Sequence, residues 1–460
     1  MMVSRRTVLS GLLASGFTTG FSPRANAVHI DAVGAHLARV GAEASGPLRL
    51  MLPEGSGDNL APILEAFTRL SGVAVETTVT HVDDINTRLT EDALLSSGAH
   101  DVALPATFGL PDLIHLGVVQ PMDPFLERYP DLYDPAGHLY THGDVFRDQH
   151  FGFQTDGDVY LLFFHDDLLR DPEEMAAFED RHGRTLATPQ TWGEFDEMMA
   201  FFNRPEDDIW GGLLFRQAGY VGWEYISRLQ AEGVPLFGEG MVPTFQSDAA
   251  IKVIEDMIRS GASQHPRSLT AGLFENWQIY KENTILANIG WGGSQKSFQQ
   301  EGSPLRGKLS HAPLPKGAGS GNGYFNWGWS FVLPQSAQQP ELGFLLSVLA
   351  MTPEISTLAV EQVGGFFDPF HESHYRSPKV REVYGDSFLR EHEAAMRAAG
   401  PDLYIPGHGN YMAGLNEHVF SAISGAARPE DALKRLQLEW ETVTFEFGRA
   451  EQARFYSRVR

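Results

Sequence analysis

The sequence predicts an α/β protein with two lobes, on three observations. The chain has 460 residues, 42% of them apolar, which is ample for two globular lobes. Between residues 48 and 104, short apolar runs alternate with helical patterns, as is typical of right-handed crossover units on a parallel sheet. Residues 159–164 form an unbroken apolar run, long enough for a buried strand, which we interpret as a crossing between lobes.

The alternating segment is interpreted as three strands joined by two helices. Residues 48–52 form the first strand, which leads into a glycine-rich loop at 55–59. Apolar residues then recur at helical spacing from Leu60 to Leu70, and Gly72 ends that helix. The next elements are a strand over residues 73–77, a helix through Ile85 and Leu89, and a strand over residues 102–104.

The rest of the chain carries helical patterns and one further strand. Thr191 begins one helix, and another surrounds Met257. Residues 326–334 are expected to return as a strand, followed by two helices broken at 352–354, where proline suits a first turn. Two terminal helices are expected to finish the chain, the second opening at Pro429.

The N-terminus has the features of a twin-arginine export signal. Arg5 and Arg6 precede a weakly apolar run, residues 8–17, that is too short to span a bilayer. Residues 25–27 then read Ala-Asn-Ala, a small-x-small cleavage site. We expect residues 1–27 to be removed and the protein to work in the periplasm.

Cysteine content and charge narrow the function classes. The chain has no cysteine, so it has neither a disulfide framework nor the thiol needed for lipid anchoring. Its net charge is −24, and loss of Arg5, Arg6 and Arg24 with the signal takes it to −27. This acidity argues against a nucleic-acid partner.

Common catalytic and cofactor motifs are missing from the sequence. The glycine-rich segment 317–323 lacks the Gly-Lys-Ser/Thr ending of a phosphate-binding loop. His392 and Glu393 are followed by Met396 where a zinc-protease helix needs a second histidine. No Gly-x-Ser-x-Gly segment occurs. The sequence therefore predicts no cofactor and no metal.

Several short segments occur in a recognisable order along most of the mature chain. They are residues 100–104 (HDVAL), 116–123 (LGVVQPMD), 156–169, 188–195 (TPQTWGEF), 287–294 (ANIGWGGS), 312–315 (APLP), 364–365 and 425–433. In this order they resemble the extracellular solute-binding proteins of family 1, the sugar-binding components of ATP-binding-cassette importers. Phe164-His165 replaces the usual Tyr-Asn, and Phe366-Phe367 replaces a common proline; these departures concern the ligand more than the fold.

The resemblance implies a type II, maltose-binding-protein-like periplasmic binding fold. Each lobe would be a sheet flanked by helices, and a hinge would let the lobes close on a ligand. We expect lobe one to comprise residues 46–153 and 328–376, and lobe two residues 154–327 and 377–460. The implied partners are a carbohydrate ligand and the permease subunits of the importer, and the protein is expected to be a monomer.

Four polar residues are candidate ligand contacts by their position in the resemblance. Asp58 lies in the first loop, Thr107 follows the third strand, and Asp156 and Asp158 lie at the hinge entry. Asp58 fits equally well as the N-cap of the next helix. A catalytic or metal-binding role for the aspartate pair is disfavoured, because alternate residues of an extended segment face opposite sides.

Four aromatic residues complete the predicted site. Trp291 and Trp327 lie among glycines, which leave a ring uncovered, and Phe366 and Tyr411 match cleft positions of the family. Aromatic residues are usually core, and for Phe366 and Tyr411 packing is the favoured interpretation.

The residue types of the predicted site suit a sugar. A sugar offers hydroxyls to carboxylates and C–H faces to flat rings. The candidate loops contain no arginine cluster, which an anionic ligand would normally need, so a neutral sugar, oligosaccharide or polyol is favoured. Arg147, Arg216 and Arg228 lie in less certain segments and leave an acidic sugar open.

Three functions from different classes follow from the sequence. The first is a periplasmic binding protein that performs no chemistry and delivers its ligand to a permease. The second is an exported carbohydrate-active enzyme that uses paired carboxylates. The third is metal capture, which needs tyrosines and histidines that converge in the cleft.

Overall fold

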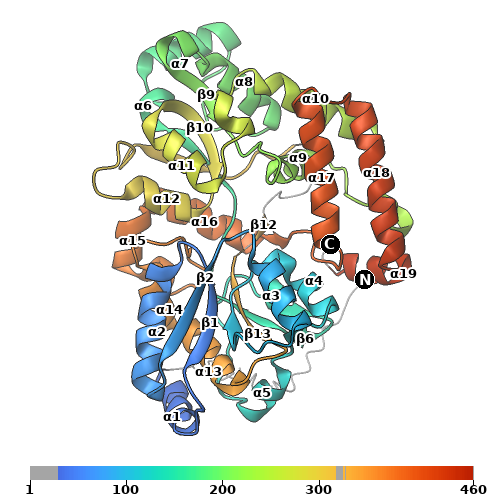
Figure 1. Ribbon diagram of the computed structural model, residues 1–460. Helices are drawn as coiled ribbons and strands as arrows, with labels where there is room; N and C mark the ends of the chain where they lie inside the picture. Colours follow the sequence, from blue (N-terminus) through green and yellow to red (C-terminus); the bar gives the residue numbers. More distant parts are fainter. Residues whose placement is uncertain (1–29, 318–324, 327, 459–460) are drawn as a thin grey trace, which may run out of the picture.

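Two separate sheets organise the protein, each with its own helices (Figure 1). The computed structural model describes residues 30–317, 325–326 and 328–458. The predicted export signal, residues 1–27, and Trp327 lie outside the described residues. The α/β class and the two lobes predicted from the sequence are confirmed.

The first sheet has six strands in the order β2-β1-β3-β13-β4, with β7 also paired to β13. β1 runs parallel to β2 and β3, as the crossover pattern predicted, whereas β13 returns antiparallel to β3, β4 and β7. The strands are β1 (Leu48–Pro53), β2 (Val75–Thr80), β3 (Val102–Ala103), β4 (Val119–Gln120), β7 (Gly152–Gln154) and β13 (Ser330–Pro334).

Helices lie on both sides of this first sheet (Figure 1). One group packs together as α1 (Ile30–Gly41), α2 (Gly57–Ser71), α13 (Pro340–Met351) and α14 (Pro353–Val360). The others are α3 (Ile85–Leu94), α4 (Leu110–His115) and α5 (Asp123–Arg128). Residues 30–41 belong to none of the predicted elements; Val33 and Leu37 are fully buried, so this helix is part of the core.

The second sheet has four strands in the order β11-β8-β10-β9. β8 is antiparallel to both of its neighbours, and β9 and β10 are parallel. The strands are β8 (Leu161–His165), β9 (Ile209–Leu213), β10 (Thr284–Gly290) and β11 (Leu309–Ala312). β8 begins two residues later than predicted, because Val159 and Tyr160 belong to the irregular link that precedes it.

The second sheet is covered by helices from distant parts of the chain. They are α6 (Asp166–Leu169), α7 (Pro172–His182), α8 (Trp192–Phe202), α11 (Leu273–Glu282), α12 (Gly292–Gln299), α15 (Pro378–Tyr384) and α16 (Asp386–Ala398). α8 begins as predicted at Thr191, whose side chain accepts from the backbone N–H of Glu194 while the Glu194 side chain accepts from the N–H of Thr191. This reciprocal cap explains why a local signal sufficed there.

The chain ends in three helices instead of the two predicted. α17 (His408–Ile423) packs against α9 (Val221–Ala231), α10 (Asp248–Gly261) and α18 (Pro429–Glu446), and α19 (Arg449–Tyr456) follows. Asp112 of α4 accepts from the backbone N–H of Gly407 (2.5 Å) and Gly409 (2.9 Å), which ties the start of α17 to the first lobe. Two minor sheets pair β5 (Val145–Phe146) with β6 (Gln149–His150) and β12 (Phe325–Asn326) with β14 (Gly400–Pro401).

In chain order, the strands change from the first sheet to the second between β7 and β8 and back to the first between β11 and β13; residues 361–377 then lead from α14 to α15, on the second sheet. The lobe boundaries given above stay a prediction. Among the described residues, no single helix is long and apolar enough to cross a membrane; α13 and α14, bent by 72°, reach that length and hydropathy only together.

Candidate functional site: an aromatic pocket between the lobes

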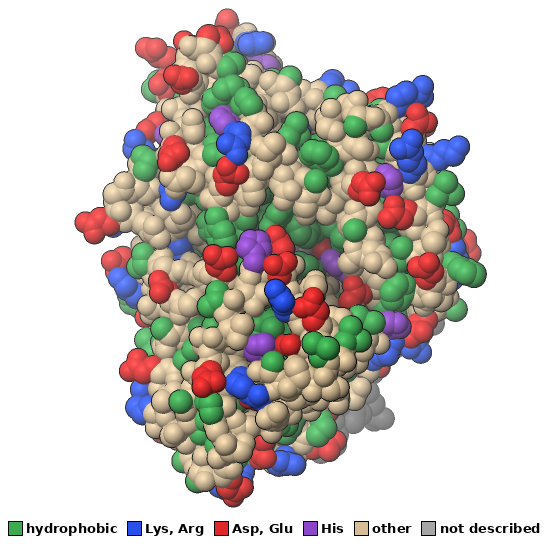
Figure 2. All heavy atoms as spheres, in the orientation of Figure 1, with side chains coloured by type: hydrophobic (Ala, Val, Ile, Leu, Met, Phe, Trp, Pro, Cys, Tyr) green, Lys and Arg blue, Asp and Glu red, His purple; other side chains and the backbone are tan. Residues whose placement is uncertain are grey.

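A pocket of about 750 Å³, including the part open to solvent, lies between the two lobes. Figure 2 shows apolar and acidic side chains gathered in the hollow between the upper and lower lobes. The lining residues are Val82, Asp83, Ala106, Phe108, Asp158, Gly219, Tyr220, Trp223, Leu273, Trp277, Trp291, Gly293, Gly328, Trp329 and Phe366.

Seven of the fifteen lining residues are aromatic. Trp291, at the start of α12, packs against the rings of Tyr160 (4.6 Å between centroids) and Phe215 (5.3 Å). Trp329, beside β13, packs against Phe366 at 5.7 Å. The four lining tryptophans are only 7 to 9% exposed, so each offers part of its ring to the pocket while the rest is held by packing.

Trp223 of α9 is fixed by a polar contact as well as by packing. Its indole Nε1 donates to Asp402 Oδ2 at 3.1 Å, and the same oxygen lies 3.2 Å from His408 Nε2. Asp402 Oδ1 accepts from the backbone N–H of Leu403. These hydrogen bonds to the ionised form hold the pKa of Asp402 below its usual range, although burial opposes them. Trp223 is therefore oriented before any ligand arrives.

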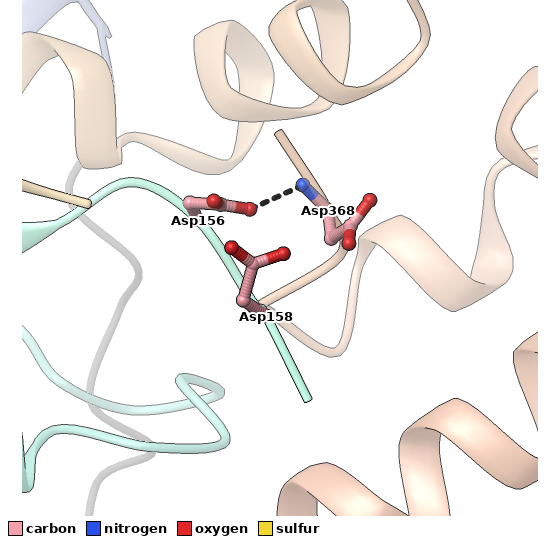
Figure 3. A group of neighbouring side chains, drawn as sticks. All are labelled: Asp156, Asp158 and Asp368. Atoms are coloured by element: carbon pink, nitrogen blue, oxygen red, sulfur yellow. Dashed lines mark hydrogen bonds between the residues drawn. The ribbon is translucent and has the colours of Figure 1, made fainter. Parts of the chain in front are cut away.

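Three aspartates converge on one another (Figure 3), and one of them, Asp158, lines the pocket. Asp156 and Asp158 come from the link between β7 and β8, and Asp368 comes from the 361–377 segment. One carboxylate oxygen of each lies within 4.8 Å of the others. Asp156 and Asp368 are fully buried, and Asp158 is half-buried and faces the pocket.

Backbone and hydroxyl donors hold Asp368 in this cluster. Its own N–H donates to Asp156 Oδ1 at 2.5 Å. Its carboxylate accepts from the N–H of Gly293 (3.1 Å) and from the hydroxyl of Tyr384 (2.9 Å). A Cβ added at Gly292 would overlap this carboxylate, so glycine is required where α12 begins.

Burial raises the pKa values of all three carboxyl groups, and repulsion between aspartates adds to the shift for Asp156 and Asp158. Burial is the main cause for Asp156 and Asp158, whose pKa values lie well above the usual range, and the neighbouring aspartates add to it. Burial raises the pKa of Asp368 to about 6, although the nearby Lys296 ammonium opposes the shift. The cluster therefore retains protons that free aspartates would have lost.

Lys296 is the cation whose charge lowers the pKa values of Asp156 and Asp368. It lies on α12, is 1% exposed, and its Nζ has no hydrogen-bond partner among the described residues. Burial lowers the pKa of Lys296 to about 8, while Asp368, Asp156 and Asp158 oppose that shift. Lys296 is not part of the pocket lining.

The expected divergence of Asp156 and Asp158 is wrong. Residues 155–158 form no strand, so the alternation of a regular strand does not apply. Instead, Asp156 Oδ1 is drawn to the backbone of Asp368, and a Cβ at Gly157 would overlap the carbonyl oxygen of Pro369. The close approach of the two segments, permitted by Gly157, brings both carboxylates to one side.

The other predicted residues divide between the pocket and the core. Asp158, Trp291 and Phe366 line the pocket. Thr107 is buried beside it, where its hydroxyl donates to the carbonyl oxygen of Gly328 at 2.9 Å. Tyr411 is fully buried between α17 and α18, its hydroxyl 2.8 Å from Thr444 Oγ1.

Asp58 lies in the first turn of α2, exposed and outside the pocket lining. The alternative that it is an N-cap is wrong, because Ser56 occupies the cap position. Ligand contact by each predicted residue stays a prediction.

Sequence reasoning missed much of the aromatic wall. Tyr220 and Trp223 stand in a Gly-Tyr-Val-Gly-Trp segment, and Trp329 follows Gly328. The glycine neighbours that singled out Trp291 mark these residues equally. Trp277, in contrast, lies on α11 with no such local mark.

The solved structures that are similar to this chain share one fold. No family model matches the chain. A solute-binding protein of an ABC transporter from Agrobacterium radiobacter K84, solved with ribitol, is similar at a TM-score of 0.77 and 16% identity, over 87% of this chain and 99% of that one. The relative from Agrobacterium vitis S4, with D-mannitol, gives 0.74 and 16% over 88% and 99%.

A third similar structure is maltose-bound MalE3 of T. maritima, with a TM-score of 0.72 and 15% identity over 86% of this chain and 100% of that one. The chain has the fold of the solute-binding proteins. In this solute-binding fold, the aromatic pocket takes residues from both lobes, so an occupant would contact both at once.

Proposed function

We propose that the protein is the substrate-binding component of an ABC importer and that it captures a sugar, oligosaccharide or polyol between its lobes. The observation that carries this proposal is the aromatic pocket, with carboxylates in its lining, between two lobes of the solute-binding fold. Rings suit the C–H faces of a sugar or polyol, and carboxylates accept from its hydroxyls. The ligands printed for similar structures, ribitol, D-mannitol and maltose, support the same class.

The proposal includes the place and partners of the protein. Residues 1–27 direct export through the twin-arginine route, the protein acts as a periplasmic monomer, and permease subunits receive the ligand. Replacement of both Arg5 and Arg6 by lysine should then leave the protein in the cytoplasmic fraction of its host. Export of this double variant at the normal rate contradicts the assignment.

A hydrolase that pairs two carboxylates of the Asp156, Asp158 and Asp368 cluster (the triad) is disfavoured by burial. Such an enzyme needs two carboxyl groups that flank the bond to be cleaved. In the triad, Asp156 and Asp368 are fully buried, and only Asp158 lines the pocket. Metal capture through tyrosines and histidines is disfavoured too, since the triad contains no histidine and feels the buried ammonium of Lys296.

One experiment tests the proposed function against both alternatives. Purified protein is mixed with a panel of mono-, di- and oligosaccharides and polyols, and melting temperature and product formation are measured. A bound ligand at 100 times its dissociation constant should stabilise the fold by about 2.7 kcal/mol, with no product. Product formation without tight binding would favour the enzyme, and loss of stability with a chelator would favour metal capture.

A further inference from the structure

The charged residues around the pocket are mostly acidic. Among the described residues of its lining, Asp83 and Asp158 are the only charged ones, and both are acidic. Behind Asp158 lie Asp156 and Asp368, and among the described residues Lys296 is the cation that lowers the pKa values of these two. Three carboxylates thus share one ammonium, which leaves an unbalanced negative charge when all of them ionise.

The rings around these carboxylates add a second attraction for positive charge. Phe108, Tyr220, Trp223, Trp277, Trp291, Trp329 and Phe366 surround the same space. The face of an aromatic ring carries the negative part of its quadrupole, and several rings around one cation form a cage. A neutral polyol uses the hydrophobic surface of such rings and donates hydrogen bonds to carboxylates, but it carries no full positive charge for the rings and carboxylates to attract.

We propose that the ligand of this pocket carries a protonated amine, as in an amino sugar or an aminated polyol. This inference rests on the proposed function and narrows its substrate class. It differs from the neutral ligand expected from the sequence. The lack of arginines disfavours an anionic ligand but not a cationic one, and the convergence of three aspartates favours the cation. Asp158, half-buried and in the lining, is the carboxylate placed to accept from the ligand ammonium, with Asp156 and Asp368 behind it.

Proton release gives a second, independent measurement of this charge. The carboxyl groups retain protons in the empty pocket, and an ammonium nearby favours their ionised forms. Binding of an amine near pH 6 should therefore release protons, so its heat should differ between buffers of different ionisation enthalpy. The titratable and charged groups that act on the triad or respond to it are Lys296 of α12, Tyr384 of α15, Tyr375, and Tyr160 of the link. Asp58 of α2 acts on Lys296, and Asp83 lines the same pocket.

The decisive experiment uses matched ligands that differ at one position, which carries a hydroxyl, an amine or an acetamide. Binding of D-glucitol, 1-amino-1-deoxy-D-glucitol and its N-acetyl derivative is measured by titration calorimetry on the full protein, with glucose, glucosamine and N-acetylglucosamine as a second set. The free amine should bind about tenfold or more tighter than its hydroxyl and acetamide counterparts. Only the amine should show a buffer-dependent heat.

Two variants with the same replacement, aspartate by asparagine, locate the effect. In Asp158→Asn, the ratio of the dissociation constants of neutral and amine ligands should fall toward one. In Asp180→Asn, an exposed position on α7 at the far end of the second lobe, the ratio should stay at the wild-type value. Melting curves without ligand check that both variants fold. If Asp158→Asn fails to fold, the buffer dependence of the heat measured on the wild type still tests the inference.

The outcomes separate this inference from the proposed function. Neutral ligands that bind as tightly as their amines, with no proton release, overturn the amine and leave the sugar-binding function standing. A panel in which no sugar, polyol or amine binds overturns the proposed function, and the inference falls with it.

Discussion

Trp291 shows how one ring serves both the core and the pocket. Its contacts with Tyr160 and Phe215 hold the ring in place, and its remaining surface lines the pocket. Trp291→Ala should weaken binding of the ligand found in the panel about 10- to 100-fold, since it removes an aromatic wall from a site of small area. The measurement is titration calorimetry.

The control for this prediction is Trp210→Ala. Trp210 is half-buried on β9 and lies outside the pocket lining. Its replacement should keep the dissociation constant within about twofold, because it removes no wall of the pocket. Equal losses of affinity in both variants would mean that Trp291 acts through general stability only.

Gly292 shows how a missing side chain makes room for a functional group. A Cβ here would overlap the Asp368 carboxylate, whereas one at Gly193 of α8 would meet its nearest neighbour, Thr191 Oγ1, at 3.9 Å. Gly292→Ala should therefore lower the free energy of unfolding by about 1–3 kcal/mol. Gly193→Ala should raise it by about 0.4–1 kcal/mol. Urea denaturation measures both, and a neutral Gly292→Ala would show that Asp368 moves away without cost.

At the scale of elements, α16 anchors the link that carries Asp156 and Asp158. His392 of α16 lies 2.8 Å from the carbonyl oxygen of Gly157 through Nε2 and 2.8 Å from the Tyr375 hydroxyl through Nδ1. A carbonyl only accepts, so Nε2 carries the proton and Nδ1 accepts from Tyr375. α16, whose sequence partly matches a zinc-protease motif, therefore carries a buried neutral histidine. This histidine anchors the link that holds Asp156 and Asp158.

The pH dependence of this anchor can be predicted with its sign. Burial lowers the pKa of His392 to about 3, against an ordinary value of 6.5 in the unfolded chain. Between pH 6.5 and 3 the unfolded chain binds the proton and the folded protein does not, so this histidine's stabilisation is lost on acidification. From pH 7 to pH 5 the loss should be about 2 kcal/mol.

A variant isolates this contribution from the other titrating groups. The difference in unfolding free energy between wild type and His392→Gln should narrow by about 2 kcal/mol from pH 7 to pH 5. The same replacement at the exposed His142 controls for the loss of one histidine. A difference that stays constant with pH would assign the acid sensitivity to other residues.

The elements themselves were largely predictable because their signals are local. α8 has its reciprocal cap, and α2 ends at Gly72, whose φ of 73° suits glycine. The third terminal helix, α19, was missed because only Gln452 and Phe455 are buried in it, so it lacks a clear apolar stripe.

At the scale of the whole molecule, the pocket links two lobes that have separate cores. Phe108 and Trp329 come from the side of the first sheet, and Trp223 and Trp291 from the side of the second. A ligand that contacts both sets favours the closed arrangement by its differential affinity for it. Addition of a saturating ligand from the panel should therefore reduce the radius of gyration measured by small-angle X-ray scattering.

The same scattering experiment on Trp291→Ala provides the comparison. At a ligand concentration that saturates the wild type but not the variant, the variant should keep the radius of gyration of the free protein. An unchanged radius for the saturated wild type would mean that the lobes are already closed without ligand.

The sequence by itself determined the α/β class, the order of most strands and helices, and three members of the pocket lining, Asp158, Trp291 and Phe366. Each depends on short-range patterns of apolar residues, glycines and caps, or on the order of motifs. Only the tertiary structure decided that Asp368 lies against Asp156 and that Trp223 and Trp329 share a pocket with Trp291. Those contacts join segments far apart in sequence. The pKa of Asp156 is raised in part by Asp368, more than 200 positions away, and no local sequence pattern predicts such a contact.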